Sequence, residues 1–250
     1  MTWGDWPLIL SSVLAQLTIG AFIVLGLVIF SGRLCFGQSD RLHRTMPVFW
    51  LLLFAAIVLR EADFMLQSHH ESYNFTREAM LIFVFFAMAL IYWFAEKALF
   101  ASDALRKAGL LLVMLCGLGY LGHGVWVRDE HWLEVVHFTA TTLCGGTLLA
   151  HAALVKAEHK VAEVDRYLPK LGAGIAVICF LVGVPQLATL AGDVEQSAGL
   201  FVAQALSLGM LLASVGVWLM PTLTKSKPAL PVMTFALVLV AGSSFGAGIG

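Results

Sequence analysis

Residues 7–30 read PLILSSVLAQLTIGAFIVLGLVIF, an apolar run that contains no charged side chain. An α-helix needs about 20 apolar residues to cross a hydrocarbon core of about 30 Å. The run is continuously apolar and does not alternate with period two, which is the pattern of a strand in a membrane barrel. It therefore predicts a helix that spans a lipid bilayer.

Seven further runs of the same kind follow, separated by charged residues or by Pro and Gly. Together the eight runs cover residues 7–30, 47–66, 79–99, 108–127, 133–155, 171–191, 199–221 and 229–249. Hydrophobic residues make up 60% of the 250 residues and charged residues 12%, whereas about a quarter of the residues in soluble domains are charged. We expect a single all-α domain over residues 1–250, a polytopic membrane bundle of eight helices.

The basic residues are distributed unevenly between the connections. Lys and Arg number 15 and Asp and Glu 16, so no basic excess indicates nucleic-acid binding. Twelve of the fifteen basic residues fall in the four connections on one side, and the other side holds only Arg60, Arg77 and Arg128. The positive-inside rule then predicts that both termini lie on the outer, periplasmic side.

The end of the second run is unusually polar for a membrane span. Arg60, Glu61 and Asp63 lie in its outer third, where ionisable groups are costly and a functional site is the default hypothesis. The connection after it carries Gln67, His69 and His70, and Arg77 and Glu78 open the next helix. A carboxylate and imidazoles at an apolar wall suit a quinol, which loses two protons as its electrons leave. The alternative is an ordinary polar loop.

Histidines give a second hypothesis. His137 and His151 are separated by close to four helical turns, so both rings point to one side of the fifth span. His123 on the fourth span can face His137, which allows a haem b between them. Hydrogen bonding between helices is the plainer role for these histidines, and close packing is the role expected for Gly117, Gly119, Gly122, Gly124, Gly145 and Gly146. We expect residues 156–170 to form a solvated connection.

Cysteine spacing limits the redox chemistry of the protein itself. Cys35, Cys116, Cys144 and Cys179 form no C-x-x-C pair and show no ferredoxin-like or zinc-like spacing. We therefore expect no iron–sulfur cluster and no metal site in this chain.

Short stretches along nearly the whole chain resemble the membrane-anchor subunit family of dimethyl sulfoxide reductase. The resemblance begins at Asp5-Trp6-Pro7-Leu8-Ile9-Leu10 with Gln16 and Gly20-Ala21-Phe22-Ile23-Val24-Leu25. It returns at Gln186-Leu187-Ala188-Thr189-Leu190, Glu195-Gln196-Ser197-Ala198, Trp218-Leu219-Met220-Pro221, Pro228-Ala229-Leu230-Pro231 and Ala241-Gly242. Residues 242–247 differ from the family, which tends to carry a Glu and an Arg there.

The resemblance implies a multi-pass anchor in the bacterial inner membrane that oxidises menaquinol. It implies two partners, an iron–sulfur electron-transfer subunit and a molybdopterin catalytic subunit, and no haem in this chain. The family's quinol site uses a His after the second helix and a Glu that opens the third. Phe75-Thr76-Arg77-Glu78-Ala79 looks like that helix start, so Glu78 is the expected acid, and Gln67, His69 or His70 takes the place of the His.

Overall fold

The computed structural model describes residues 5–67, 77–95, 98, 102–159, 161–192 and 194–249. Within these ranges the protein is helical apart from short turns. Its helices are α1 (Trp6–Phe30), α2 (Phe36–His43), α3 (Met46–Gln67), α4 (Arg77–Phe94), α6 (Asp103–Val127), α7 (Trp132–Lys156), α8 (Ala162–Ala191), α9 (Val194–Leu223) and α10 (Leu230–Ile249).

Eight of the helices in the described part of the chain are long and apolar enough to cross a membrane, which confirms the predicted all-α bundle. Two polar helical segments were not predicted. The expected connection before the second span contains the short helix α2, and α8 begins at Ala162, not at residue 171. Both segments are polar, so hydropathy misses them. The acids Glu163 and Asp165 suit the first turn of α8, where the helix dipole is positive.

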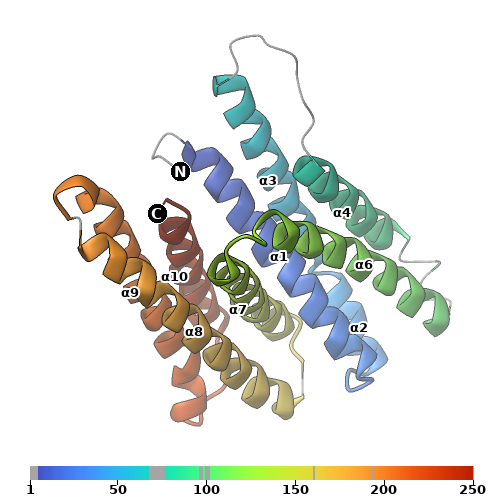
Figure 1. The fold of residues 1–250 in the computed structure, drawn as a ribbon. Coiled ribbons are helices and arrows are strands. Elements are labelled where there is room, and N and C mark those ends of the chain that lie inside the picture. Colours follow the sequence, from blue (N-terminus) through green and yellow to red (C-terminus); the bar gives the residue numbers. More distant parts are fainter. Residues whose placement is uncertain are drawn as a thin grey trace.

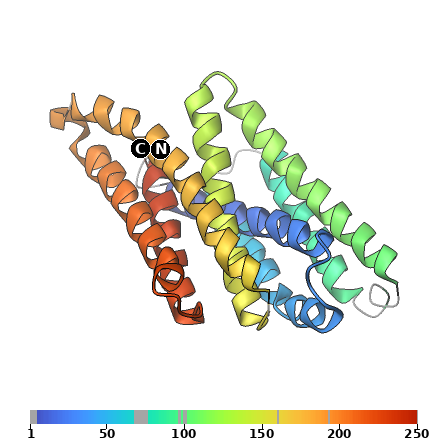
Figure 2. The ribbon, with the colours of Figure 1, turned by 90° about the horizontal axis from the view of Figure 1, so that it is seen from below.

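The spans form two rings of four helices (Figure 1). In the first ring α1, α3, α4 and α6 contact one another in order, and α6 returns to α1. In the second ring α7, α8, α9 and α10 do the same, and α10 returns to α7. Helices α1 and α7 lie against each other and join the rings, as the view from below also shows (Figure 2). These two central helices are mostly buried, whereas the other six spans expose most of their length.

The contact between α1 and α7 depends on two glycines. A Cβ atom on Gly146 would overlap the backbone of Gly20, and one on Gly20 would overlap the carbonyl oxygen of Thr142. The two backbones therefore touch, as is typical of membrane helices whose interfaces consist of small residues. The packing role expected for Gly146 is confirmed. The same role is wrong for Gly119 and Gly122, where an added Cβ would meet no atom of the described residues within 4 Å.

The helix ends gather at two opposite faces. We call the face where α1 begins and α10 ends the termini face, and the other the opposite face (Figure 1). At the opposite face α2 joins the two rings. Arg41 donates hydrogen bonds to the carbonyl oxygens of Ala157 at 2.9 Å and Glu158 at 3.2 Å, just beyond α7. Arg106 of α6 donates to Ser39 at 3.0 Å.

Candidate functional site

A cavity of about 490 Å³ lies at the termini face, where the two rings meet. Its apolar wall includes Leu8, Ile9, Val13, Phe138 and Leu190. The polar residues that line it come from both rings and are Ser12, Gln16, Arg60, Glu78, Arg128, Glu134, His137, Thr141, Gln186, Thr189, Gln204 and Ser244. It thus combines apolar side chains with many hydrogen-bonding groups.

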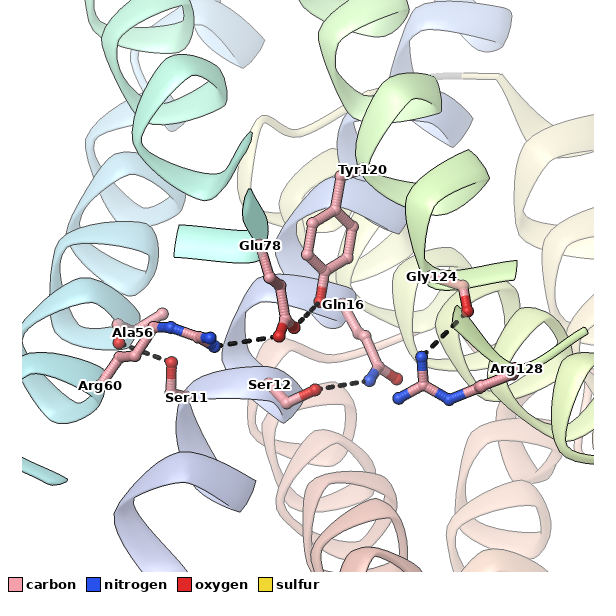
Figure 3. Close-up of polar contacts among 9 residues, drawn as sticks. All are labelled: Ser11, Ser12, Gln16, Ala56, Arg60, Glu78, Tyr120, Gly124 and Arg128. Carbon is pink, nitrogen blue, oxygen red and sulfur yellow. Dashed lines mark hydrogen bonds and ion pairs between the residues drawn. The ribbon is translucent and has the colours of Figure 1, made fainter. Parts of the chain in front are cut away.

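Glu78 is held in the cavity wall by residues of two other helices (Figure 3). It lies in the first turn of α4, where the positive end of the helix dipole favours a carboxylate. Arg60 of α3 donates from Nη1 to Glu78 Oε2 at 3.1 Å, and the Tyr120 hydroxyl of α6 donates to Oε1 at 3.4 Å. The side chains of Arg60 and Glu78 are 14% and 32% exposed. These two contacts hold both carboxylate oxygens of Glu78 in place at the cavity wall.

Helix α1 places further polar side chains beside Arg60 and Glu78 (Figure 3). The Gln16 amide donates to Ser12 Oγ at 2.9 Å, and the Ser11 hydroxyl donates to the Ala56 carbonyl oxygen of α3 at 2.6 Å. Arg128, which directly follows α6, donates to the Gly124 carbonyl oxygen at 3.0 Å. Its guanidinium lies 4.5 Å from the centre of the Phe138 ring, a cation–π distance.

The structure brings together two of the predicted site residues, Arg60 and Glu78. Arg77 is exposed and lies over the Trp126 ring at 5.7 Å, and it is not among the described residues that line the cavity. His69 and His70 lie outside the described residues. Gln67 is the last residue of α3, and its side chain also lies outside the described part.

Several residues that line the cavity or contact Glu78 were not predicted. Tyr120 sits in an apolar run where a buried tyrosine gives no distinct signal. Ser12 and Gln16 did give a signal, because they are polar residues inside the otherwise apolar first span. Gln186 and Gln204 face each other across α8 and α9, with an amide hydrogen bond at 3.3 Å. Only the packed bundle shows that Ser12, Gln16, Gln186 and Gln204 line one cavity and that Tyr120 contacts Glu78 in its wall.

The histidines weighed as haem ligands have different surroundings. His137 of α7 lines the cavity. His123 of α6 packs edge-on against Trp126, whose side chain is 59% exposed, and it is absent from the described cavity lining. The described contacts therefore give the haem hypothesis no support.

A second polar cluster, which we call the histidine lock, lies at the opposite face and consists of His151, His159, Asp165 and Trp218. Asp165 Oδ1 accepts a hydrogen bond from His151 Nε2 at 3.0 Å and from His159 Nε2 at 2.9 Å. Trp218 Nε1 donates to His151 Nδ1 at 2.9 Å. The lock thus ties α7, α8 and α9 together, so the plainer prediction of interhelical hydrogen bonding is confirmed for His151.

The lock also corrects the prediction of a solvated connection over residues 156–170. Residues 162–170 are helical, and Asp165 accepts hydrogen bonds from two nearly buried imidazoles. The mixed charges of this segment are typical of a surface loop, and the sequence alone does not show which carboxylate is turned inward. The helical periodicity of Val164 and Leu168, both buried, was the available signal.

The ligand atoms of His151, His159 and Asp165 lie within 4.8 Å of one another, close enough for a single metal ion. Their hydrogen bonds oppose metal binding. The Trp218 and Val161 N–H groups are donors only, so the Nδ1 atoms of His151 and His159 must be acceptors. Each ring then carries its proton on Nε2, where the metal would need a lone pair. The donor set does not fit an ion.

Fold and cavity together define a class of protein, a polytopic membrane subunit with a polar, partly apolar-walled cavity near one membrane face. The sequence profile of the DMSO reductase anchor subunit (DmsC) family matches residues 1–249, and the chain belongs to this family. It is therefore a multi-pass inner-membrane protein and the membrane anchor of a DMSO reductase-type complex. Membership implies association with the catalytic and iron–sulfur subunits of such a complex.

Two curated relatives come from Escherichia coli (strain K12). The C subunit of anaerobic dimethyl sulfoxide reductase is 27% identical, over 99% of this chain and 94% of the relative. The YnfH subunit of anaerobic dimethyl sulfoxide reductase is 25% identical, over 96% of this chain and 91% of the relative. No solved structure is significantly similar to this chain.

Proposed function

We propose that this anchor oxidises menaquinol in the cavity at the termini face and passes the electrons to an iron–sulfur subunit docked there. The observation that carries the proposal is the position of Glu78, a carboxylate paired with Arg60 in the wall of a cavity whose lining also includes apolar side chains. A quinol headgroup needs a proton acceptor next to its hydroxyl, and its isoprenoid tail needs an apolar surface.

Quinol oxidation releases two protons and two electrons and leaves the quinone. Glu78 accepts the proton of one hydroxyl, while Arg60 and Tyr120 hold its two oxygens in place. His137, which lines the same cavity from α7, accepts the second proton. The two electrons pass one after the other to a cluster of the partner subunit, and the quinone leaves the cavity. Leu8, Val13 and Phe138 contact the ring and tail.

We further propose that the termini face is the outer face. Ten of the twelve basic residues assigned to the inner side are among the described residues, and all ten belong to connections at the opposite face or to helix ends that adjoin it. The positive-inside rule places that face in the cytoplasm. Protons released from the cavity then leave on the outer side.

Replacement of Glu78 tests the site. Glu78→Gln removes the proton acceptor but keeps the side-chain shape, and we expect quinol oxidation by the assembled complex to slow by about a hundredfold. The measurement is the rate of oxidation of a menaquinol analogue by membrane vesicles of known orientation. A pH probe on each side of the same vesicles reports where protons are released.

The matched control is Glu130→Gln, an identical change at an exposed carboxylate of the termini face that is absent from the cavity lining. It should leave the rate unchanged, and both variants should retain the partner subunits. A Glu78→Gln complex that oxidises quinol at the normal rate would refute the site. Proton release on the side of the opposite face would refute the orientation.

A further inference from the structure

A second cavity, of about 510 Å³, lies at the opposite face between α8, α9 and the connection after α9. Three cationic side chains line it, Arg166 and Lys170 from α8 and Lys225 from just beyond α9. Thr222 and Ser226 add hydroxyl groups. We call it the basic pocket. The quinol hypothesis makes no use of it.

The cations of the basic pocket differ from two arginines of the same face. Arg33 pairs with Glu163, and Arg44 pairs with Asp40 at 3.0 Å. Within the described residues, by contrast, no ion pair and no side-chain hydrogen bond uses Arg166, Lys170 or Lys225. One carboxylate, that of Asp165, also lines the pocket, and its Oδ1 already accepts two hydrogen bonds. The lining therefore carries an excess of positive charge that suits an anion.

The base of the pocket is rigid. Trp218 packs against Gly172, where a Cβ atom would overlap the indole ring, and it is fixed by its hydrogen bond to His151. Pro169 and Pro221, which also line the pocket, are buried. Because the histidine lock holds α7, α8 and α9 in register, an anion meets a preformed site and little ordering entropy is lost on binding.

The surroundings of the pocket indicate a lipid. Tyr167 follows the lining residue Arg166 on α8, and Leu223 follows the lining residue Thr222 on α9. These two side chains are 59% and 77% exposed. In a membrane-spanning bundle such apolar side chains face acyl chains, and tyrosine is enriched at the depth of the lipid headgroups. Leu171 and Met220 extend this exposed apolar surface from the pocket along both helices.

We propose that the basic pocket binds the phosphate of an anionic phospholipid, whose acyl chains lie along the exposed faces of α8 and α9. Basic pockets between membrane helices bind anionic headgroups because each nearby cation attracts the phosphate. Arg166 can bind phosphate oxygens through two parallel N–H groups, and Lys170 and Lys225 add point charges. A free phosphate shares the headgroup chemistry but gains nothing from the apolar surface.

The test uses the purified full-length protein in detergent and three probes: phosphatidylglycerol, phosphatidylcholine and inorganic phosphate. Native mass spectrometry gives the dissociation constant of each lipid, and thermal unfolding gives the midpoint with each probe. We expect phosphatidylglycerol alone to raise the midpoint. The substitutions Arg166→Gln, Lys170→Gln and Lys225→Gln should each weaken its binding by about fivefold, which corresponds to about 1 kcal/mol per cation.

The matched control is Lys156→Gln, which removes an exposed lysine of the same face that is absent from the pocket lining. It should leave the dissociation constant of phosphatidylglycerol unchanged. Lipid-free midpoints equal to that of the parent protein show that the variants fold. Equal binding of phosphatidylcholine, equal stabilisation by inorganic phosphate, or equal weakening by Lys156→Gln would each overturn the proposal.

Discussion

Arg60, Glu78 and Tyr120 form a group at the cavity, which we call the Glu78 cluster. This cluster and the histidine lock both place charged and hydrogen-bonding residues inside an apolar bundle, yet they differ in how many of their donors and acceptors are hydrogen-bonded. In the lock all four imidazole nitrogens are hydrogen-bonded, and the side chains of His151 and His159 are 1% and 2% exposed. In the cavity wall, each carboxylate oxygen of Glu78 accepts one hydrogen bond from the described residues and the side chain is 32% exposed, so a carboxylate lone pair stays available to a ligand. A saturated polar cluster serves stability, and an unsaturated one can serve a ligand.

The largest expected effect is a loss of stability when the histidine lock is broken. Asp165→Ala leaves two buried imidazole N–H groups without an acceptor, so we expect it to lower the free energy of unfolding by about 3 kcal/mol. Thermal unfolding of the purified protein measures this. Quinol oxidation per assembled complex should not change, because the lock lies at the other end of the bundle from the cavity.

Asp40→Ala is the control, since it removes a carboxylate of the same face that pairs with the exposed Arg44. Such surface pairs contribute about 0.5 kcal/mol, so the unfolding midpoint should hardly move. If Asp165→Ala were equally mild, or if it slowed quinol oxidation by the assembled complex, the division between the clusters would fail.

A smaller effect is expected from Tyr120→Phe, which removes the hydroxyl that holds Glu78 Oε1. Arg60 still pairs with Glu78, so the protein should remain as stable as before. We expect quinol oxidation to fall by about fivefold, which corresponds to the loss of one hydrogen bond of about 1 kcal/mol. Tyr92→Phe makes the same change at a buried tyrosine near the opposite face and should leave the rate intact. Equal rates for the two variants would contradict the role of Tyr120.

The smallest effect is the response of the lock to zinc, for which we expect none. Both Nε2 atoms carry protons because both Nδ1 atoms accept hydrogen bonds from groups that can only donate. Added Zn²⁺ should therefore leave the unfolding midpoint of the full-length protein unchanged. A rise in the midpoint that disappears in His159→Ala would show that the lock opens to bind metal.

The fold could be predicted from the sequence because the eight apolar runs are long and clearly separated. Hydropathy measures only burial in lipid, however, and so it missed the polar helix α2 and the first turns of α8. It also could not predict that the helices form two rings, since contacts such as that between Gly20 and Gly146 join residues far apart in the sequence.

The candidate site was predicted only in part, because local sequence patterns do not show which distant residues meet. Arg60 and Glu78 stood out because they are charges at the end of one span and the start of the next. Gln16, Tyr120 and His137 reach the same region from other helices, and no local pattern relates them. The lock was missed because His151 and Asp165 meet across a connection that was interpreted as solvated.

The contact between α1 and α7 has a consequence for synthesis. Translation runs from the N-terminus, so α1, α3, α4 and α6 enter the membrane before the partner of Gly20 exists. Helix α1 carries no charged side chain and can wait in lipid with its glycine face uncovered. The wall that holds Glu78 is made early, and the facing wall from α7 to α10 is made late. The cavity is therefore complete only after α10 has been inserted.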